Sequence, residues 1–206
     1  MDWTSLYLKT ADLNVFILGT GEVATRRANR FLSHGANVKL AGNNLSEELE
    51  HNGAVLCSTE NVDELVEWAD LVVVASGDEE LCNHVCDIAQ NKLVNRADYP
   101  QKGDIIVPTS FNIGEIEISI FTNGKSPLMA RQLRKKIQSI ITEEDILEIE
   151  LQDYARTELK KVIENQKERR EYLYEIFDDE NINDLIKNRQ IDEAKCYIDN
   201  LIRGLE

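Results

Sequence analysis

Two glycines in a short turn are the first residues of this chain that could bind a ligand. Gly19 and Gly21 follow the apolar run at residues 15–18 and precede a charged, amphipathic stretch that begins at Glu22. Glycines let a backbone approach a pyrophosphate, and the N-terminus of a following helix offers N–H groups and partial positive charge to phosphate oxygens. Ala24 stands at the position of the third glycine in the Gly-x-Gly-x-x-Gly fingerprint of dinucleotide-binding turns. Its small side chain leaves room for the helix to pack on the strand. The spacing favours a dinucleotide site over a tight turn that binds nothing.

The end of the second predicted strand bears on which dinucleotide would bind. NAD sites usually carry Asp or Glu there to hold the ribose hydroxyls, but this chain has Asn43 and Asn44. An amide can hydrogen-bond a ribose and does not repel a 2′-phosphate, so the residues leave NAD and NADP both open. The residues expected to contact the cofactor are Gly19, Thr20, Gly21, Glu22, Val23, Asn43, Asn44 and Ser76.

Asp98 is the best single candidate for a catalytic group. It lies just before Pro100 and just after a short predicted strand, where a carboxylate beside an oxidisable substrate could act as a base. The alternative is an Asp that caps backbone N–H groups in a turn before proline. On position alone, the alternative is favoured.

A second candidate site lies at residues 121–127. The turn there leads into a predicted helix with Ser126 as its N-cap and Pro127 at its first position. Free amides at that helix end, together with Lys125, could receive a carboxylate or phosphate, and Arg131 follows one turn later. A capped helix with a basic surface explains the same residues equally well.

The elements around these candidates alternate between strand and helix. Strands are predicted at 15–18, 38–41, 54–57, 71–75 and 93–94, and helices at 22–34, 46–51, 62–68 and 79–90. Such alternation predicts an α/β fold, a Rossmann-type parallel sheet with helices on both faces. Ligands of these sheets bind at the carboxyl ends of the strands, so residues 19–23, 75–78 and 95–98 should converge on one cleft. Asn44 is the expected N-cap of the second helix.

The pattern changes after Pro100. Antiparallel strands are predicted at 104–108 and 116–121, followed by a helix from 126 to about 141. Residues 143–206 are polar with spaced apolar positions, which predicts a cap of several amphipathic helices. The predicted domains are therefore a nucleotide-binding domain over 1–110, a small α+β dimerisation segment over 111–145 and a helical domain over 146–206.

Composition narrows the choice of partners and compartment. The 206 residues carry a net charge of −15, so the chain has no electrostatic footprint for nucleic acid. It has neither an apolar run long enough to span a bilayer nor the features of a signal peptide, which predicts a cytoplasmic protein with no membrane contact. The four cysteines are expected to be reduced thiols, and no metal site is expected because no Cys or His cluster has ligand spacing.

Several motifs together resemble the precorrin-2 dehydrogenase module of siroheme synthases. Residues 19–28 read Gly-Thr-Gly-Glu-Val-Ala-Thr-Arg-Arg-Ala, residues 75–78 Ala-Ser-Gly-Asp, and residues 95–98 Asn-Arg-Ala-Asp. Residues 124–131, Gly-Lys-Ser-Pro-Leu-Met-Ala-Arg, are the most distinctive match. The resemblance covers nearly the whole chain. Arg96 departs from it, since the family has a small apolar residue there, and the side chain would contact or crowd the substrate.

The resemblance implies NAD-dependent oxidation of precorrin-2 to sirohydrochlorin by a homodimer, with Asp98 as the essential residue. Bifunctional members also insert Fe²⁺, and no metal-binding cluster in this chain supports that second step. The substrate is a tetrapyrrole polycarboxylate, and its expected contacts are Thr122, Lys125, Ser126 and Arg131. The alternatives are a nucleotide-sensing regulatory module without catalysis and a dehydrogenase for another small acid.

Overall fold

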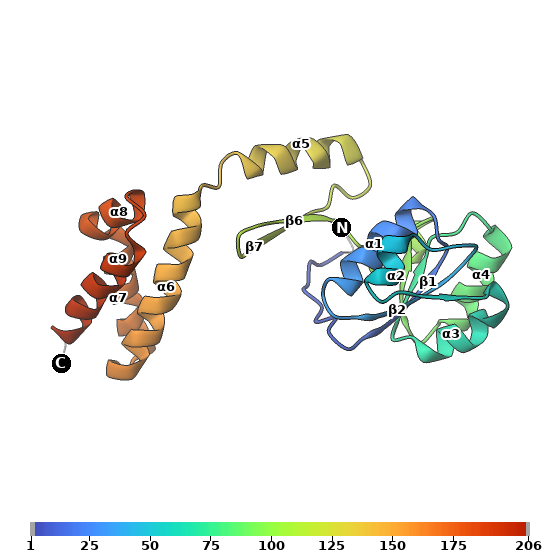
Figure 1. The fold of residues 1–206 in the computed structure, drawn as a ribbon, viewed down its shortest axis with the longest axis horizontal. Helices are drawn as coiled ribbons and strands as arrows, with labels where there is room; N and C mark the ends of the chain where they lie inside the picture. The colour runs from blue at the N-terminus through green and yellow to red at the C-terminus, as the bar shows by residue number, and fades with distance from the viewer. Residues whose placement is uncertain (1–2, 205–206) are drawn as a thin grey trace. The chain divides into compact units, whose positions relative to one another are not determined.

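The computed structural model describes residues 3–204, which divide along the chain into two compact units, with the boundary between Val107 and Pro108 (Figure 1). Residues 1–2 and 205–206, which belong to the predicted first and last domains, lie outside this description.

The first unit is built on a five-stranded parallel sheet. Its strands are β1 (Asn14–Leu18), β2 (Asn37–Ala41), β3 (Val55–Cys57), β4 (Leu71–Val74) and β5 (Leu93–Arg96), in the order β3-β2-β1-β4-β5. All four neighbouring pairs run parallel, as the strand–helix alternation predicts. The predicted Rossmann-type fold is confirmed.

Helices cover both faces of this sheet. They are α1 (Glu22–Leu32), α2 (Glu47–His51), α3 (Val62–Trp68) and α4 (Glu79–Ile88), with a 3₁₀ turn at Thr59–Asn61. All of β4, and all of β1 after Asn14, can be apolar and buried because a sheet covered on both faces exposes neither set of side chains.

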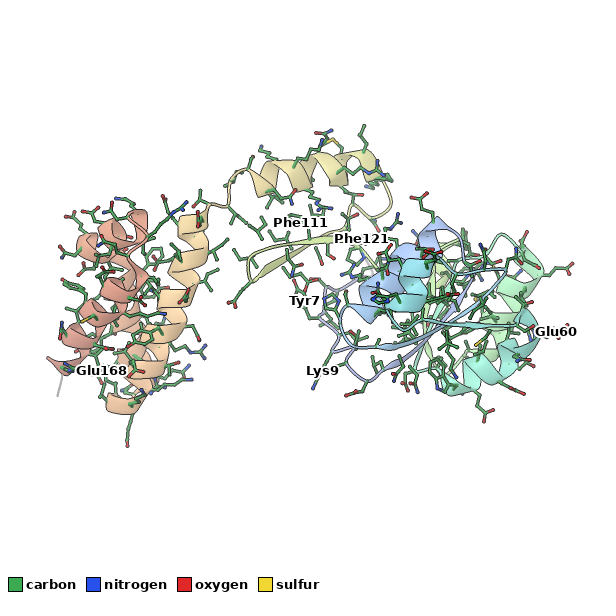
Figure 2. The ribbon with its side chains drawn as sticks, in the orientation of Figure 1. Tyr7, Lys9, Glu60, Phe111, Phe121 and Glu168 are labelled. Atoms are coloured by element: carbon green, nitrogen blue, oxygen red, sulfur yellow. The ribbon has the colours of Figure 1, made fainter. Side chains whose placement is uncertain are left out.

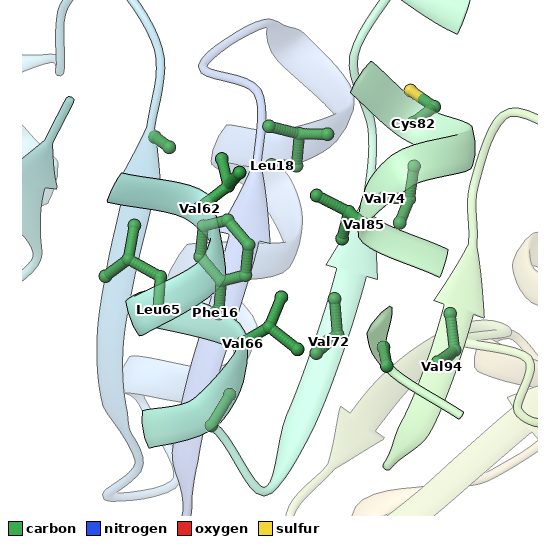
Figure 3. Close-up of a cluster of buried hydrophobic side chains, with 13 residues drawn as sticks. Phe16, Leu18, Val62, Leu65, Val66, Val72, Val74, Cys82, Val85 and Val94 are labelled. Atoms are coloured by element: carbon green, nitrogen blue, oxygen red, sulfur yellow. The ribbon is translucent and has the colours of Figure 1, made fainter. Parts of the chain in front are cut away.

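One apolar cluster lies between the sheet and the α3–α4 pair, and Figure 3 shows it. Phe16 of β1 and Val72 of β4 pack there against Leu65 of α3 and Val85 of α4. The opposite face of β1 presents Val15 and Ile17 to a second cluster, which α1 and α2 complete. Alternation along β1 therefore sends successive side chains into different cores.

The cap predicted for α2 is wrong. Ser46, not Asn44, caps α2, because the Ser46 hydroxyl accepts a hydrogen bond from the N–H of Leu49 at 3.3 Å. Both residue types are good caps, and the one adjacent to the first helical residue has the required geometry.

The predicted strand at 104–108 is also wrong, since the residues that pair as a strand are 109–113. After the 3₁₀ turn at Pro100–Lys102, the N–H groups of Asp104 and Ile105 both bond to the carbonyl of Val94. This segment follows β5 and packs Ile105 and Val107 against the first unit's core. Its apolar residues are explained by that packing, without a strand.

The second unit begins with a hairpin and a helix. The strands β6 (Thr109–Ile113) and β7 (Ile116–Ile120) pair antiparallel, and α5 (Pro127–Gln138) follows. Phe111 of β6 lies beneath α5, with the guanidinium of Arg134 at 5.2 Å from its ring centre, whereas Phe121 is 41% exposed (Figure 2).

Four helices complete the second unit: α6 (Glu143–Val162), α7 (Gln166–Asp178), α8 (Glu180–Lys187) and α9 (Ile191–Arg203). They enclose a core of Leu, Ile and Ala side chains, as the spaced apolar positions predict. Among residues 3–204, no helix combines the length and apolar character that a bilayer crossing requires. The cysteines in the described part of the chain are all free thiols.

Candidate functional site

The carboxyl ends of the central strands lie side by side. Leu18, at the end of β1, pairs with Ala41 of β2 and with Val74 of β4, and Val74 pairs with Arg96 of β5. Neighbouring strands are about 4.8 Å apart, so the loops after β1 and β5 begin about 10 Å from each other. The chain adds β2 and β3 on one side of β1 and then crosses to add β4 and β5 on the other side. Open α/β sheets bind ligands at such a crossover point, which here lies between β1 and β4.

Gly19 occupies a position that admits no side chain. Its φ is +113°, and a Cβ on it would lie 2.4 Å from the carbonyl oxygen of Ala75. Its N–H donates to the carbonyl of Ala41 at 2.8 Å. The loop is therefore held between the ends of β2 and β4, and Thr20 packs so closely on Gly42 that a Cβ there would meet its methyl group at 2.6 Å.

The N-terminus of α1 has the features of an anion site. Gly21 is its N-cap, no side chain caps the first turn, and a Cβ on Gly21 would meet no atom within 4 Å. The first-turn N–H groups of α1 therefore have no side-chain cap and are free to bond to phosphate oxygens. The N-terminus of α4 differs, because Asp78 closes it by accepting from the N–H of Leu81 at 3.0 Å. These residues fit the pyrophosphate of a dinucleotide at α1.

The other predicted cofactor contacts surround this turn. Glu22 and Val23 form the first turn of α1, and Glu22 makes only an exposed ion pair with Arg26 at 3.8 Å. Asn43 and Asn44 follow β2 at the same sheet edge and are exposed. Ser76 follows β4, where its hydroxyl accepts from the N–H of Asp78 at 3.2 Å.

Asp98 follows β5 at this edge, paired with Arg96. Arg96 Nε donates to Asp98 Oδ1 at 2.9 Å, and a second nitrogen of the same guanidinium bonds to Oδ2. The Arg96 side chain is 6% exposed and that of Asp98 26%. Burial opposes ionisation of Asp98, but the hydrogen bonds and charge of Arg96 outweigh it and hold the pKa of that carboxyl below its usual value.

Sequence reasoning missed a second contact at this edge, between Arg27 of α1 and Asn95 of β5. Asn95 is 1% exposed, accepts from the Arg27 guanidinium and donates to the carbonyl of Ile105 at 2.8 Å. Burial, followed by repulsion from Arg26 and Arg30, lowers the pKa of Arg27 to about 10. The contact joins α1 to β5, the strand that Asp98 follows. The signal was the polar residue Asn95 directly after the apolar pair Leu93-Val94 of the predicted strand.

The predicted substrate contacts of the second unit lie at the start of α5. The Thr122 hydroxyl accepts from the N–H of Ser126 at 3.3 Å, and the Ser126 hydroxyl accepts from the N–H of Met129 at 3.1 Å. These two hydroxyls thus build the turn and the helix cap, as predicted for Ser126. Lys125 and Arg131 are exposed beside them.

A hollow of about 470 Å³ lies elsewhere in the second unit, on the surface of α6 and α7. Glu148, Asp153 and Arg156 line it together with Ile149 and Phe177. Its two carboxylates outnumber its one cation, so it does not suit a polycarboxylate. Within residues 3–204, no three His, Cys, Asp or Glu side chains are grouped so that they could hold a metal ion.

Known proteins are similar to this chain in sequence and in fold. The chain is 29% identical over 190 residues to a precorrin-2 dehydrogenase of Methanosarcina barkeri, covering 86% of this chain and 84% of that one. It is 29% identical over 194 residues to a siroheme synthase of Mannheimia succiniciproducens, covering 90% of this chain and 40% of that one. The chain thus spans about 40% of the length of such siroheme synthases.

The solved structure of SirC, a precorrin-2 dehydrogenase, has the same fold, with a TM-score of 0.76 at 24% identity over 94% of this chain and 98% of that one. The resemblance expected from the motifs is thereby confirmed. A family model described as NAD(P)-binding matches residues 6–109, just over half of the chain, including the loop at Gly19 and the turn at Asp98. The chain belongs to this NAD(P)-binding family.

Proposed function

We propose that this protein is a dehydrogenase that uses NAD to oxidise precorrin-2 to sirohydrochlorin. Relatives that match most of this chain carry the name precorrin-2 dehydrogenase, and the chain belongs to an NAD(P)-binding family. The observation that carries the proposal is the position of Asp98. It places a carboxylate at the sheet edge where the Gly19 loop and α1 can hold a dinucleotide.

The reaction removes a hydride and a proton from the tetrapyrrole. NAD⁺, when bound, supplies the hydride acceptor. Loss of hydride leaves positive charge on the ring, and the ionised Asp98 is suited to stabilise that charge and to accept the proton. Its side chain is partly exposed, so a substrate can approach it, while Arg96 keeps it a carboxylate.

The proposed contacts for the substrate's carboxylates are residues of the second unit. Lys125, Arg131 and the amides at the start of α5 offer positive charge to a polycarboxylate, and Thr122 and Ser126 shape their turn.

We assign residues 111–145 to a homodimer interface. Leu128 and Met129 of α5 support this assignment, since they are 66% and 50% exposed. The predicted domains 1–110, 111–145 and 146–206 and the cytoplasmic location belong to the same proposal, and metal insertion does not.

The test uses the variant Asp98→Ala with precorrin-2 and NAD⁺. We expect oxidation, followed through the tetrapyrrole spectrum, to be lost while NAD⁺ binding measured by calorimetry is retained. Glu80→Gln, which removes an exposed carboxylate from the first turn of α4, is the control and should keep its activity. Normal turnover by Asp98→Ala would refute the assigned role. No turnover by the unmodified protein, despite NAD⁺ binding, would favour a nucleotide sensor.

A further inference from the structure

Arg96 is the residue at which the candidate site departs from the motif that this chain resembles. It ends β5, and its guanidinium is turned onto the Asp98 carboxylate, with one nitrogen for each oxygen. Such a two-pronged pairing fixes the rotation of a carboxylate as well as its position. The Arg96 side chain is only 6% exposed and is therefore poorly placed to contact substrate directly.

The third guanidinium nitrogen of Arg96 is also engaged, on the side away from Asp98. It donates to Asn83 Oδ1 at 3.4 Å and to Cys86 Sγ at 3.2 Å. Both partners lie on α4, the helix that packs on the sheet through Val85. The orientation of Asp98 is therefore coupled through Arg96 to a packed helix as well as to its own turn.

The charged groups around Asp98 determine how readily its carboxyl ionises. From β5 it faces Arg96, from α4 the thiols of Cys82 and Cys86, and within its own turn the N–H of Tyr99. Burial raises the pKa of both thiols, so both are neutral at neutral pH. Of these neighbours, Arg96 is the one that carries a full charge.

We propose that Arg96 is a positioning residue of the dehydrogenase, which holds the Asp98 carboxylate ionised and fixed in rotation with α4 as its anchor. The inference rests on the proposed function, and it assigns a role to the residue at which this chain departs from the motif it resembles. An ion pair that served folding alone would leave the pH dependence of turnover unchanged when its charge is removed.

The first experiment compares Arg96→Met, which removes the charge, with Arg96→Lys, which retains it but loses the two-pronged geometry. An adjacent cation lowers a carboxyl pKa by about 1 to 3 units. In the plot of kcat against pH, Arg96→Met should therefore shift the acid limb, where activity falls at low pH, to higher pH by about that amount. The sign follows because Asp98 loses the cation that favours its ionised form. Arg96→Lys should keep the limb near its original pH and lower kcat, because the carboxylate is less well oriented.

The matched control is Lys92→Met. It removes one cation just before β5, at the opposite edge of the sheet, where Lys92 donates to the carbonyl of Glu67. It should change neither the acid limb nor kcat. In each variant that retains Asp98, the affinity for NAD⁺ should stay within about twofold, a change of about 0.4 kcal/mol. An acid limb that Arg96→Met leaves unmoved would overturn the inference.

A second measurement does not depend on activity. Carboxyl NMR of the full chain, with the Asp98 signal identified by its loss in Asp98→Asn, gives the pKa of Asp98 directly. A value below the usual range that rises in Arg96→Met supports the inference, and a value unaffected by that change refutes it. If the unmodified protein shows this pKa but no oxidation of precorrin-2, the proposed function fails and the Arg96 pairing stands without a catalytic role.

If Arg96→Met fails to fold, a double variant, Asn83→Ala with Cys86→Ala, tests instead whether α4 anchors Arg96. This double variant leaves Arg96 and Asp98 in place and removes both contacts on α4. We expect kcat to fall several-fold, with the acid limb and NAD⁺ affinity unchanged, because the charge remains and the orientation is loosened. An unchanged kcat would overturn the proposed anchoring.

Discussion

Gly19 shows how one residue can decide whether the cofactor turn forms. Its backbone lies in the left-handed region, and the carbonyl of Ala75 occupies the space that a side chain would need. The N–H of Gly19 is also bonded to the carbonyl of Ala41, so the residue cannot move away without losing that bond. Two separate requirements for glycine coincide at one position, directly before the N-terminus of α1.

We expect Gly19→Ala to lower the affinity for NAD⁺ by at least about tenfold, because displacing the loop misaligns the first-turn N–H groups of α1 by enough to cost about 1.4 kcal/mol. The measurement is calorimetric titration with NAD⁺. Gly53→Ala is the matched control, since Gly53 also has a positive φ, of +95°, but a Cβ there meets nothing within 4 Å. Both variants should lose stability from backbone strain, and only Gly19→Ala should lose affinity. Equal affinity losses would contradict the explanation.

At the level of single residues, part of the candidate site could be predicted from the sequence and part could not. The glycine turn was predictable because a pattern of residue types carries it, and so was the place of Asp98 after a strand. The pairing of Asp98 with Arg96 was not. Residues two apart in an extended chain lie on the same side, but the sequence does not show that the chain stays extended past Arg96, where the N–H of Ala97 still bonds to the carbonyl of Val74.

At the scale of elements, buried strands and capped helices were the predictable part. The apolar run that forms β4 predicts a strand covered on both faces, and α3 spans the residues its pattern predicts. The strand predicted at 104–108 failed for a physical reason. Ile105 and Val107 pack on the first unit's core, and such packing requires apolar residues just as a buried strand does. The two structures therefore give similar sequence patterns.

The cap of α6 allows a test at this scale. Thr142 accepts from the N–H of Asp145 while Asp145 accepts from the N–H of Thr142 at 2.7 Å, a reciprocal capping box. We expect Thr142→Ala to lower the free energy of unfolding of the helical unit by about 1 kcal/mol, measured by urea denaturation with circular dichroism. Thr157→Ala is the control within the same helix, at an exposed interior position, and should be neutral or slightly stabilising because alanine favours helix. A loss of similar size at both positions would contradict the capping role.

At the scale of the whole molecule, charge is the main constraint. The chain carries a net charge of −15, and its proposed substrate is a polyanion, so long-range electrostatics oppose their association. Binding then requires cations concentrated near the substrate. Lys125 and Arg131, exposed at the start of α5, are such a concentration, whereas the hollow on α6 and α7 is lined by more acids than bases.

Lys125→Glu therefore tests whether local or total charge governs substrate binding. We expect it to raise KM for precorrin-2 by about tenfold, equivalent to about 1.4 kcal/mol, and to leave NAD⁺ affinity unchanged, because Lys125 is not among the contacts proposed for NAD⁺. Lys187→Glu makes the same change in net charge on α8, where Lys187 pairs with Asp184 at 3.2 Å. If local charge is decisive, Lys187→Glu has little effect on KM. Added salt should also weaken substrate binding less in Lys125→Glu than in the unmodified protein, because the variant has one fewer attraction for salt to screen. If both variants raise KM equally, total charge governs association and Lys125 has no specific role.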